Sequence, residues 1–501
     1  MIVVYAGLSL SLAALPALAE AREVMTLQQC RDSAMANNIS LKESAQKVRI
    51  AGYDRKIAMA NYFPEVSASM AYMYNSRDLD LLPEKYAETL PALGTALQGS
   101  LQSCISGLLG NPAFLQMLQK NPELQQLLGS LASTDISGPV NAVGAEIRQA
   151  FNLDITNVFA GAVSVRQPVF MGGRIVNSNR MAKLAEELAA TQHDAMTREV
   201  IAEVDNAYWQ IVSISGKNRL ARDYADLLSM MQHDTEALVA EGLATEADLL
   251  SVKVKKNEAD MLLVKTTNGL ALSKMLLCKI CGMSIDPDIV LADENPDAIP
   301  LPEMCPRNSD DEIFAARPEI RSLSLASRIY DTKINVARAS MMPEVALTAS
   351  YFLSDPNVFH GFRNDFDGMF NVGIAVKVPI VHGREAAQKV RKAKAEAVLA
   401  DFRLEEAKES VALQVASLRM QETESADKVE MTGKSLASAE ENLRTATAGY
   451  TEGLIPANVL MEAQTAWVKA HSEYIDACTE LQLNAVNLAI AQGQNPYVHE
   501  R

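Results

Sequence analysis

The residues of this chain that could support metal or redox chemistry are six cysteines and six histidines. One cysteine pair has a motif spacing, Cys-Lys-Ile-Cys from Cys278 to Cys281. A zinc site would need a second Cys or His pair, a dithiol redox site would need a βαβ context, and the sequence offers neither. The pair falls near the end of a helical pattern, where cysteine usually acts as a small buried apolar residue. Which cysteines form a disulfide, if any, stays open.

Catalytic patterns are missing from the sequence. The histidines are scattered, without an HExxH motif or a nucleophile motif, and we expect them to be solvated. The chain is therefore predicted not to be an enzyme, to have no catalytic or metal-ligating residues and to need no cofactor. A formal net charge of −16 argues against a nucleic-acid partner, because phosphate binding requires clustered Lys and Arg.

The first 19 residues contain no charged side chain and are predicted to be a signal peptide. They combine an apolar run, Ile2 to Ala14, with the small-x-small cleavage site Ala17-Leu18-Ala19. A buried terminal helix is the alternative. Beyond this segment no apolar run reaches the length of a spanning helix, but an exported chain can still enter a membrane as a closed β-barrel.

The rest of the chain is an internal duplication. Pro168 matches Pro379, Glu241 matches Glu452, and Gly282 matches Gly493, each 211 residues further on. The predicted division is a signal peptide (1–19), a first repeat (20–282), a linker (283–312), a second repeat (313–493) and a C-terminal tail (494–501).

The first repeat carries an insertion. Pro64 and Pro168 are 104 residues apart, whereas their counterparts Pro343 and Pro379 are 36 apart, so the first copy holds 68 additional residues. They occupy about residues 77–152 and have a helical, apolar pattern interrupted by Asn-Pro. A surface decoration, a lid and a partner-docking site all remain open.

Each repeat contains two stretches that alternate with period two. Pro64 and Pro343 stop a helix and start such a stretch, because proline ends helices and favours extended chain. Another runs from Phe370 to Val381. One face is apolar and the other is small or polar over about ten residues, which is typical of a transmembrane barrel strand. A half-buried strand of a soluble sandwich shows the same alternation.

Each repeat also contains a very long helical pattern. Residues 174–240 and 384–450 contain no proline, and a helix of that length spans on the order of 100 Å. The apolar spacing of threes and fours calls for coiled-coil-like neighbours. Both helices end at Glu-Gly-Leu, where Gly242 and Gly453 suit a left-handed cap. A returning helix follows each turn, over 245–281 and 456–492.

This order of elements resembles the TolC family of outer-membrane channel proteins. The motifs that carry the resemblance are "PEV" at both helix-to-strand steps, "QPVFMGGR" and "VPIVHGR" at the strand-to-helix steps, and "EGL" at both tips. The resemblance covers about residues 26–493. It implies a mixed α/β membrane protein: a trimeric 12-stranded β-barrel in the outer membrane, with four strands per chain, continued by an α-helical barrel in the periplasm.

The resemblance also implies partners and site residues. The partners are two further copies of the chain, a periplasmic adaptor, an inner-membrane pump of RND or ABC type, and outer-membrane lipid. Candidate residues of a tunnel gate are Tyr450, Asp248 and Glu462. Candidate adaptor contacts are Gly242, Leu243, Ala244, Gly453 and Leu454. Candidates for the barrel lumen are Arg166 and Lys377, which fall on the small or polar side of their strands.

Two departures from the family pattern matter. Val459 stands where a second acidic residue would complete a ring with Glu462, and Ile455-Pro456 replaces a more polar tip. The leading hypothesis is a passive export duct driven by a partner pump. The alternative is a periplasmic coiled-coil scaffold or binding protein without a pore, and a self-contained porin would not need such long helices. The cargo, whether drug, metal or protein, is left open.

Overall fold

The computed structural model describes residues 24–294, 299–357, 359, 365–380 and 384–494. The predicted signal peptide and most of the predicted C-terminal tail lie outside the described residues. The chain forms two compact units. One comprises Met1–Met59, Gly173–Ser340 and Val381–Arg501, and the other comprises Ala60–Gly172 and Met341–Ile380. These units cut across the two repeats, so the repeat boundaries stay a prediction.

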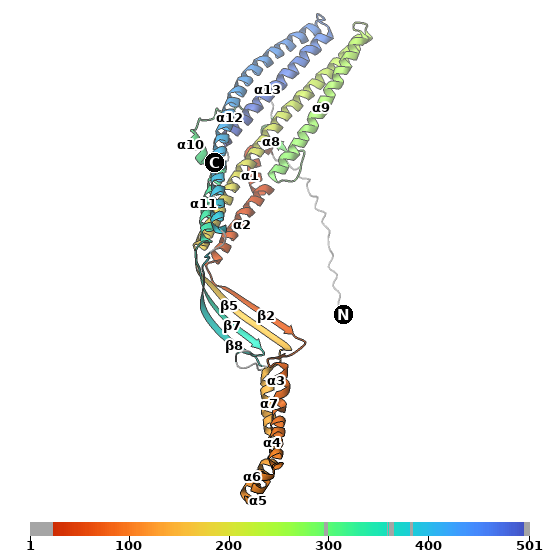
Figure 1. The fold of residues 1–501 in the computed structure, drawn as a ribbon. Helices are drawn as coiled ribbons and strands as arrows, with labels where there is room; N and C mark the ends of the chain where they lie inside the picture. Colours follow the sequence, from red (N-terminus) through yellow and green to blue (C-terminus); the bar gives the residue numbers. More distant parts are fainter. Residues whose placement is uncertain (1–23, 295–298, 358, 360–364, 381–383, 495–501) are drawn as a thin grey trace, which may run out of the picture. The chain divides into compact units, whose positions relative to one another are not determined.

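A four-stranded antiparallel sheet organises the second unit, with the order β2-β5-β7-β8 (Figure 1). The strands are β2 (Glu65–Tyr74), β5 (Asn157–Met171), β7 (Glu344–Asp355) and β8 (Asp367–Lys377). Four strands per chain match the prediction, although the last strand ends at Lys377 rather than Val381. β2 and β8 are the edges of this sheet, so each has one side without a strand partner among the described residues.

The register gives the whole sheet two chemically different faces. Glu65 lies opposite Arg166, and Glu344 lies opposite Lys377. Residues directly opposite in an antiparallel pair point to the same face, and each strand alternates between faces. The face that holds Arg166 and Lys377 also holds small or hydroxyl residues, for example Ser67, Ser164, Thr348, Ser350, Asn371 and Gly373. The other face holds mainly apolar residues, for example Val66, Val163, Leu347, Val372 and Ile374.

Two long helical hairpins form most of the first unit (Figure 1). One pairs α8 (Arg174–Ala240) with α9 (Glu246–Cys281), and the other pairs α12 (Glu385–Thr451) with α13 (Ala457–Ala491). The shorter helices α1 (Leu27–Asn37), α2 (Ile39–Ala60), α10 (Asp310–Ala316) and α11 (Pro318–Ala339) complete the unit, and α11 packs against both α8 and α12. The long helices therefore confirm the predicted spans to within a residue at each end.

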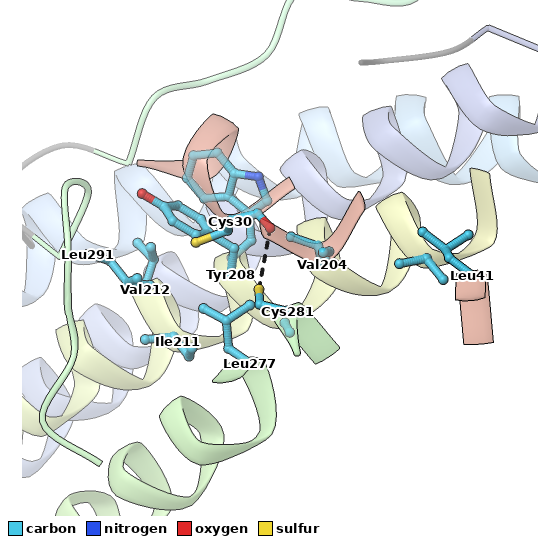
Figure 2. Close-up of a cluster of buried hydrophobic side chains, with 13 residues drawn as sticks. Cys30, Leu41, Val204, Tyr208, Ile211, Val212, Leu277, Cys281 and Leu291 are labelled. Atoms are coloured by element: carbon cyan, nitrogen blue, oxygen red, sulfur yellow. Dashed lines mark hydrogen bonds between the residues drawn. The ribbon is translucent and has the colours of Figure 1, made fainter. Parts of the chain in front are cut away.

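The core of this unit lies where α1 meets α8 and the end of α9 (Figure 2). Cys30, Tyr208 and Cys281 are fully buried there. The Cys281 thiol donates to the Cys30 carbonyl at 3.4 Å, and all six cysteines of the chain are free thiols. Beside this cluster Arg31 donates to both carboxylate oxygens of Asp205, at 2.7 and 2.9 Å. A short parallel pair, β1 (Val24–Met25) with β6 (Val290–Leu291), attaches the start of the predicted linker to the same region.

The insertion between β2 and β5 is helical, as its pattern indicates. It contains β3 (Leu79–Asp80), α3 (Glu84–Thr89), the 3-10 turn η1 (Leu90–Ala92), α4 (Leu93–Leu109), α5 (Pro112–Lys120), α6 (Pro122–Ser133), α7 (Ser137–Phe151) and β4 (Asn152–Leu153). β3 pairs with β4, and α4 packs against α7. Among the residues that the structure describes, no helix combines the length and apolar character needed to cross a membrane.

Two of the histidines expected to be solvated are instead partly buried. The Nδ1 atom of His193 shares a hydrogen bond with the Ser44 hydroxyl at 2.5 Å. His471 packs edge-on against Trp467, and burial lowers the pKa of its imidazole. These positions lie on helix faces that a neighbouring helix covers, and spacing along one helix does not reveal such a cover. His360, His382 and His499 lie outside the described residues.

Candidate functional site at the helical tips

Both long hairpins turn at their tips through the same backbone motif. Gly242 and Gly453 have φ of 73° and 68°, the left-handed region in which glycine has no Cβ to clash. Leu243 N donates to Leu238 O at 2.8 Å, and Leu454 N donates to Gly449 O at 2.7 Å. These bonds satisfy carbonyls that the helix end would leave without a partner. The Gly-Leu pair is thus sufficient to end each helix.

The two returning helices begin differently. Thr245 caps α9: its hydroxyl accepts from Asp248 N at 3.2 Å, and Asp248 Oδ2 accepts from Thr245 N at 3.1 Å and from its hydroxyl at 2.6 Å. These hydrogen bonds from Thr245 lower the pKa of the Asp248 carboxyl. Pro456 precedes α13 and makes no side-chain cap. A Thr three residues before an Asp is a recognisable capping box, so the sequence already held this signal.

Asp248 and Tyr450 line the same cavity between the two tips. The cavity has a volume of about 840 Å³ and receives side chains from all four long helices and both turns. No hydrogen bond joins Asp248 to Tyr450 within the described part of the chain, and Asp248 Oδ1 and the Tyr450 hydroxyl have no partner there. Tyr450 is half-buried against the apolar cluster at the tips, which includes Leu228, Met231 and Leu460. The structure thus brings together two groups that could form a hydrogen bond, without joining them in one protomer.

The cavity also contains a polar residue that the sequence analysis missed. Gln464 of α13 is 1% exposed, and its Oε1 atom has no hydrogen-bond partner within the described residues. A buried amide without a partner costs free energy, so such a group usually marks a functional position or a bound water. Sequence spacing gives no signal for Gln464, because its burial depends on how the second hairpin packs against α8.

The predicted adaptor-contact leucines are strongly exposed. Leu243 is 76% exposed and Leu454 is 79% exposed. A leucine at this position of the turn frequently packs back onto its own helix. Here both leucines project from the tips, and a Cβ added at Gly242 or Gly453 would meet nothing within 4 Å. The tips therefore expose leucine side chains next to glycine backbone that a partner could contact.

Glu462 lies apart from the other two gate candidates. It is exposed on α13 and lines a separate groove with Lys255, Met461 and Lys469. The structure thus groups Asp248 with Tyr450 but not with Glu462. Val459, at the position where a second acid is missing, is 41% exposed.

Arg166 and Lys377 lie at matching places in the two repeats, on the same face of the sheet and opposite Glu65 and Glu344. Each basic residue therefore shares its end of the sheet with an acidic one. The motif Pro-Glu-Val supplies the acid, and the strand before the next helix supplies the base. Among the described residues there is no cluster of three or more His, Cys, Asp or Glu side chains that could hold a metal ion.

Comparison with known proteins gives consistent matches. The family model "Outer membrane efflux protein" matches residues 311–494. OpmQ, a pyoverdine export outer membrane protein of Pseudomonas aeruginosa, is 25% identical over 342 residues, which are 66% of this chain and 67% of OpmQ.

Two solved structures have the same fold. The CmeC outer membrane channel of Campylobacter jejuni superposes with a TM-score of 0.67 at 14% identity, covering 98% of this chain and 93% of CmeC. The MtrE outer membrane channel of Neisseria gonorrhoeae, in its open state, has a TM-score of 0.67 at 17% identity and covers 94% and 89%.

The duplicated strand and helix unit, with its two-faced sheet and paired tips, has the fold of the CmeC and MtrE outer membrane channels. The chain is similar to the outer membrane efflux proteins of the TolC family, whose family model matches residues 311–494. It is an outer-membrane channel of a tripartite efflux or export system, and it extends into the periplasm. The family and the fold are those of channel proteins rather than enzymes.

Proposed function

We propose that this chain works as a homotrimer that forms a closed duct, with its helical tips docking a periplasmic adaptor that links it to an inner-membrane pump. The observation that carries the proposal is the sheet with two chemically different faces and two open edges. An open edge leaves backbone N–H and C=O groups without partners, which is prohibitive in lipid. Three copies joined edge to edge would close a twelve-stranded β-barrel with the apolar face toward lipid and the small, polar face toward the lumen.

The duplication supports a specific register for the contact between protomers, in which β8 of one protomer pairs with β2 of the next; we call this contact the seam. Within the chain, β5 of the first repeat pairs with β7 of the second, and Arg166 lies opposite Thr348. The equivalents of these residues are Lys377 on β8 and Ser69 on β2. The seam from β8 to the next protomer's β2 would therefore place Lys377 opposite Ser69, and Ala375 opposite Ala71.

Cysteine pairs test this seam. Ala71→Cys with Ala375→Cys should form a disulfide between protomers, because opposed residues bring their Cβ atoms to a distance that a disulfide can bridge. Ser67→Cys with Ala375→Cys is the matched control, four residues out of register, and should stay reduced. A covalent trimer ladder from the first pair alone supports the proposal. A monodisperse, water-soluble monomer with folded strands would overturn it and would favour the alternative of a scaffold without a pore.

We propose further that Tyr450 and Asp248 close the tunnel. Within the described residues, Asp248 keeps one carboxylate oxygen without a hydrogen bond after capping α9, and the Tyr450 hydroxyl on the same cavity also lacks a partner. A hydrogen bond from this hydroxyl to the carboxylate of a neighbouring hairpin would be worth on the order of 1.5–3 kcal/mol when shielded from water. Three such bonds in a trimer would total several kcal/mol, enough to favour a closed state.

The adaptor would dock on the tips next to this gate. The exposed Leu243 and Leu454, with Gly242, Ala244 and Gly453, provide apolar side chains and accessible backbone at the entrance of the 840 Å³ cavity. Contacts made there only in the open state would shift the population toward opening. Site-specific photo-cross-linking from Leu243 should capture a periplasmic adaptor in cells. Leu243→Ser with Leu454→Ser should lower export without changing the amount of trimer in the outer membrane.

A further inference from the structure

The helical insertion of residues 79–153 is connected to the edge of the sheet. It follows β2, an edge strand, and returns into β5. The antiparallel ladder continues into its base, where Asn75 N donates to Thr156 O at 2.8 Å and Leu81 N donates to Phe151 O at 3.0 Å. In the homotrimer proposed above, the free side of β2 is the seam with the next protomer. Each insertion would therefore rise directly from an interface between copies.

One side of α4 contacts other segments of the insertion. Gly144 of α7 lies so close to the backbone of Leu90 that a Cβ there would come within 1.9 Å of the carbonyl oxygen. Asn141 of α7 accepts from Gly94 N at 2.8 Å and donates to Thr95 Oγ1 at 2.8 Å. Gln98 accepts from Ile136 N at 3.2 Å. The side of α4 that holds residues 94, 95 and 98 therefore faces the rest of the insertion.

A second side of α4 is apolar and uncovered in the single chain. Leu93, Leu97 and Leu108 are 44%, 47% and 41% exposed, and the exposed Cys104 lies between them. At about 100° per residue these four positions fall within one stripe along the helix. α7 adds Val143 and Phe151, which are 55% and 44% exposed. A helix that packs on one side and exposes an apolar stripe on another normally has a further neighbour.

The charge pattern indicates which neighbour suits this stripe. No Asp, Glu, Lys or Arg occurs between Glu88 and Lys120, in a chain whose net charge is −16. Several copies of such a neutral helix can approach one another without charge repulsion. Copies held in one trimer also meet at a high effective concentration, so modest apolar contacts suffice.

We propose that the three insertions of a trimer pack against one another around its axis, with the α4 stripe of each copy seated on the insertion of the next. This inference rests on the homotrimer proposed above. It assigns the stripe to a second copy of this chain and makes the insertion a second zone of contact between protomers, beyond the strand seam.

Cys104 is a natural probe of this contact. It is the exposed cysteine of the chain; Cys305 is partly exposed and the other four are buried. In detergent-solubilised trimers, a short bis-maleimide should link Cys104 to Cys104 and give a covalent dimer. At most two-thirds of the chains can be linked, because threefold symmetry leaves one cysteine of the three without a partner. Cys104→Ser should abolish the dimer band.

Two variants make the test specific to the stripe. Gln102→Cys in a Cys104→Ser background moves the thiol about half a turn round α4, and it should cross-link at least ten-fold more slowly. Leu97→Glu should slow the Cys104 cross-link at least ten-fold, because the contact would then bury a carboxylate against the neighbouring insertion. Both variants should retain the seam disulfide between Ala71→Cys and Ala375→Cys, which reports the trimer independently.

The outcomes separate the inference from the proposal on which it depends. If the seam disulfide forms but Cys104 does not cross-link, the trimer stands and the insertion bundle is wrong. If neither forms, both are wrong. If Cys104 in intact cells is protected from a soluble maleimide but does not cross-link in the purified trimer, an external protein or lipid covers the stripe, and the assignment to a second copy is overturned.

Discussion

Glu344 and Lys377 lie directly opposite each other across β7 and β8, and Glu65 and Arg166 hold the matching places across β2 and β5. The same acid and base thus recur at the same end of both hairpins, on the face that we assign to the lumen. The duplication therefore includes cross-strand residue pairs as well as single sequence motifs. It also allows the importance of charge at this end of the sheet to be tested in one repeat while the other serves as an internal reference.

Reversing one charge of this pair should destabilise the sheet slightly. Lys377→Glu places two carboxylates opposite each other, and such cross-strand pairs are worth roughly 0.2–1 kcal/mol. We expect a lower midpoint of thermal unfolding for the trimer in detergent. Adding Glu344→Lys should restore most of the loss. An equal midpoint for the single and double variants would show that the two side chains do not interact.

The two faces of β8 should differ sharply in their tolerance of charge. Ile374→Lys puts an ammonium group on the apolar face, at a cost of about 2–4 kcal/mol if the position lies near the bilayer midplane. Asn371→Lys, three residues away on the polar face, is the matched control. We expect the first variant to lower the yield of outer-membrane trimer and the second to leave it near wild type. Equal tolerance would argue against the assignment of lipid and lumen faces.

Loss of the proposed gate should open the tunnel. Tyr450→Phe combined with Asp248→Ala should raise single-channel conductance in planar bilayers and sensitise cells to large antibiotics. Asp248→Ala also removes part of the α9 cap, so Thr245→Ala is the control that weakens the cap but keeps the carboxylate. Higher conductance in Thr245→Ala alone would attribute the effect to the cap. Glu462→Gln should weaken cation selectivity if Glu462 lines the constriction.

The cap at the first tip should depend on pH in a defined direction. Its hydrogen bonds to Thr245 hold the pKa of Asp248 below the ordinary carboxyl value, so the carboxylate stabilises the folded tip at neutral pH. That contribution should be lost as the pH falls through the lowered pKa. Hydrogen–deuterium exchange of residues 242–250 should show stronger protection than in Thr245→Val at pH 7. The difference should disappear in strong acid, and a difference that is constant with pH would contradict this account.

Removing one partner of the buried ion pair should lower the stability of the fold strongly, whereas replacing both partners with apolar residues should not. Arg31 and Asp205 are 3% and 0% exposed, and they join α1 to α8. Arg31→Met takes the guanidinium away from the buried Asp205 carboxylate, and breaking a buried ion pair in this way costs on the order of 3–5 kcal/mol. Arg31→Met with Asp205→Leu removes both charges and should recover much of the thermal stability. A double variant no better than the single one would indicate that the pair contributes to stability beyond mutual neutralisation.

The sequence by itself determined the repeating architecture. Period-two alternation after Pro64 and Pro343, proline-free stretches that end at Gly242 and Gly453, and recurrence at one offset were sufficient to place four strands and two long hairpins. These signals are local, because backbone periodicity and the special φ of glycine and proline act within a few residues. For the same reason the end of β8 was misplaced by four residues: alternation continues past Lys377, although the ladder does not.

Only the tertiary structure decided which side chains meet. It placed Asp248 and Tyr450 on one cavity and Glu462 on another groove, and it buried Gln464 with an Oε1 atom that has no hydrogen-bond partner among the described residues. It also paired Arg31 with Asp205, 174 residues apart in the chain. Spacing along one helix specifies which residues share a face, but not which distant element covers that face. The shared cavity of Asp248 and Tyr450, the burial of Gln464 and the pairing of Arg31 with Asp205 depend on the packing of whole helices, which local sequence does not encode.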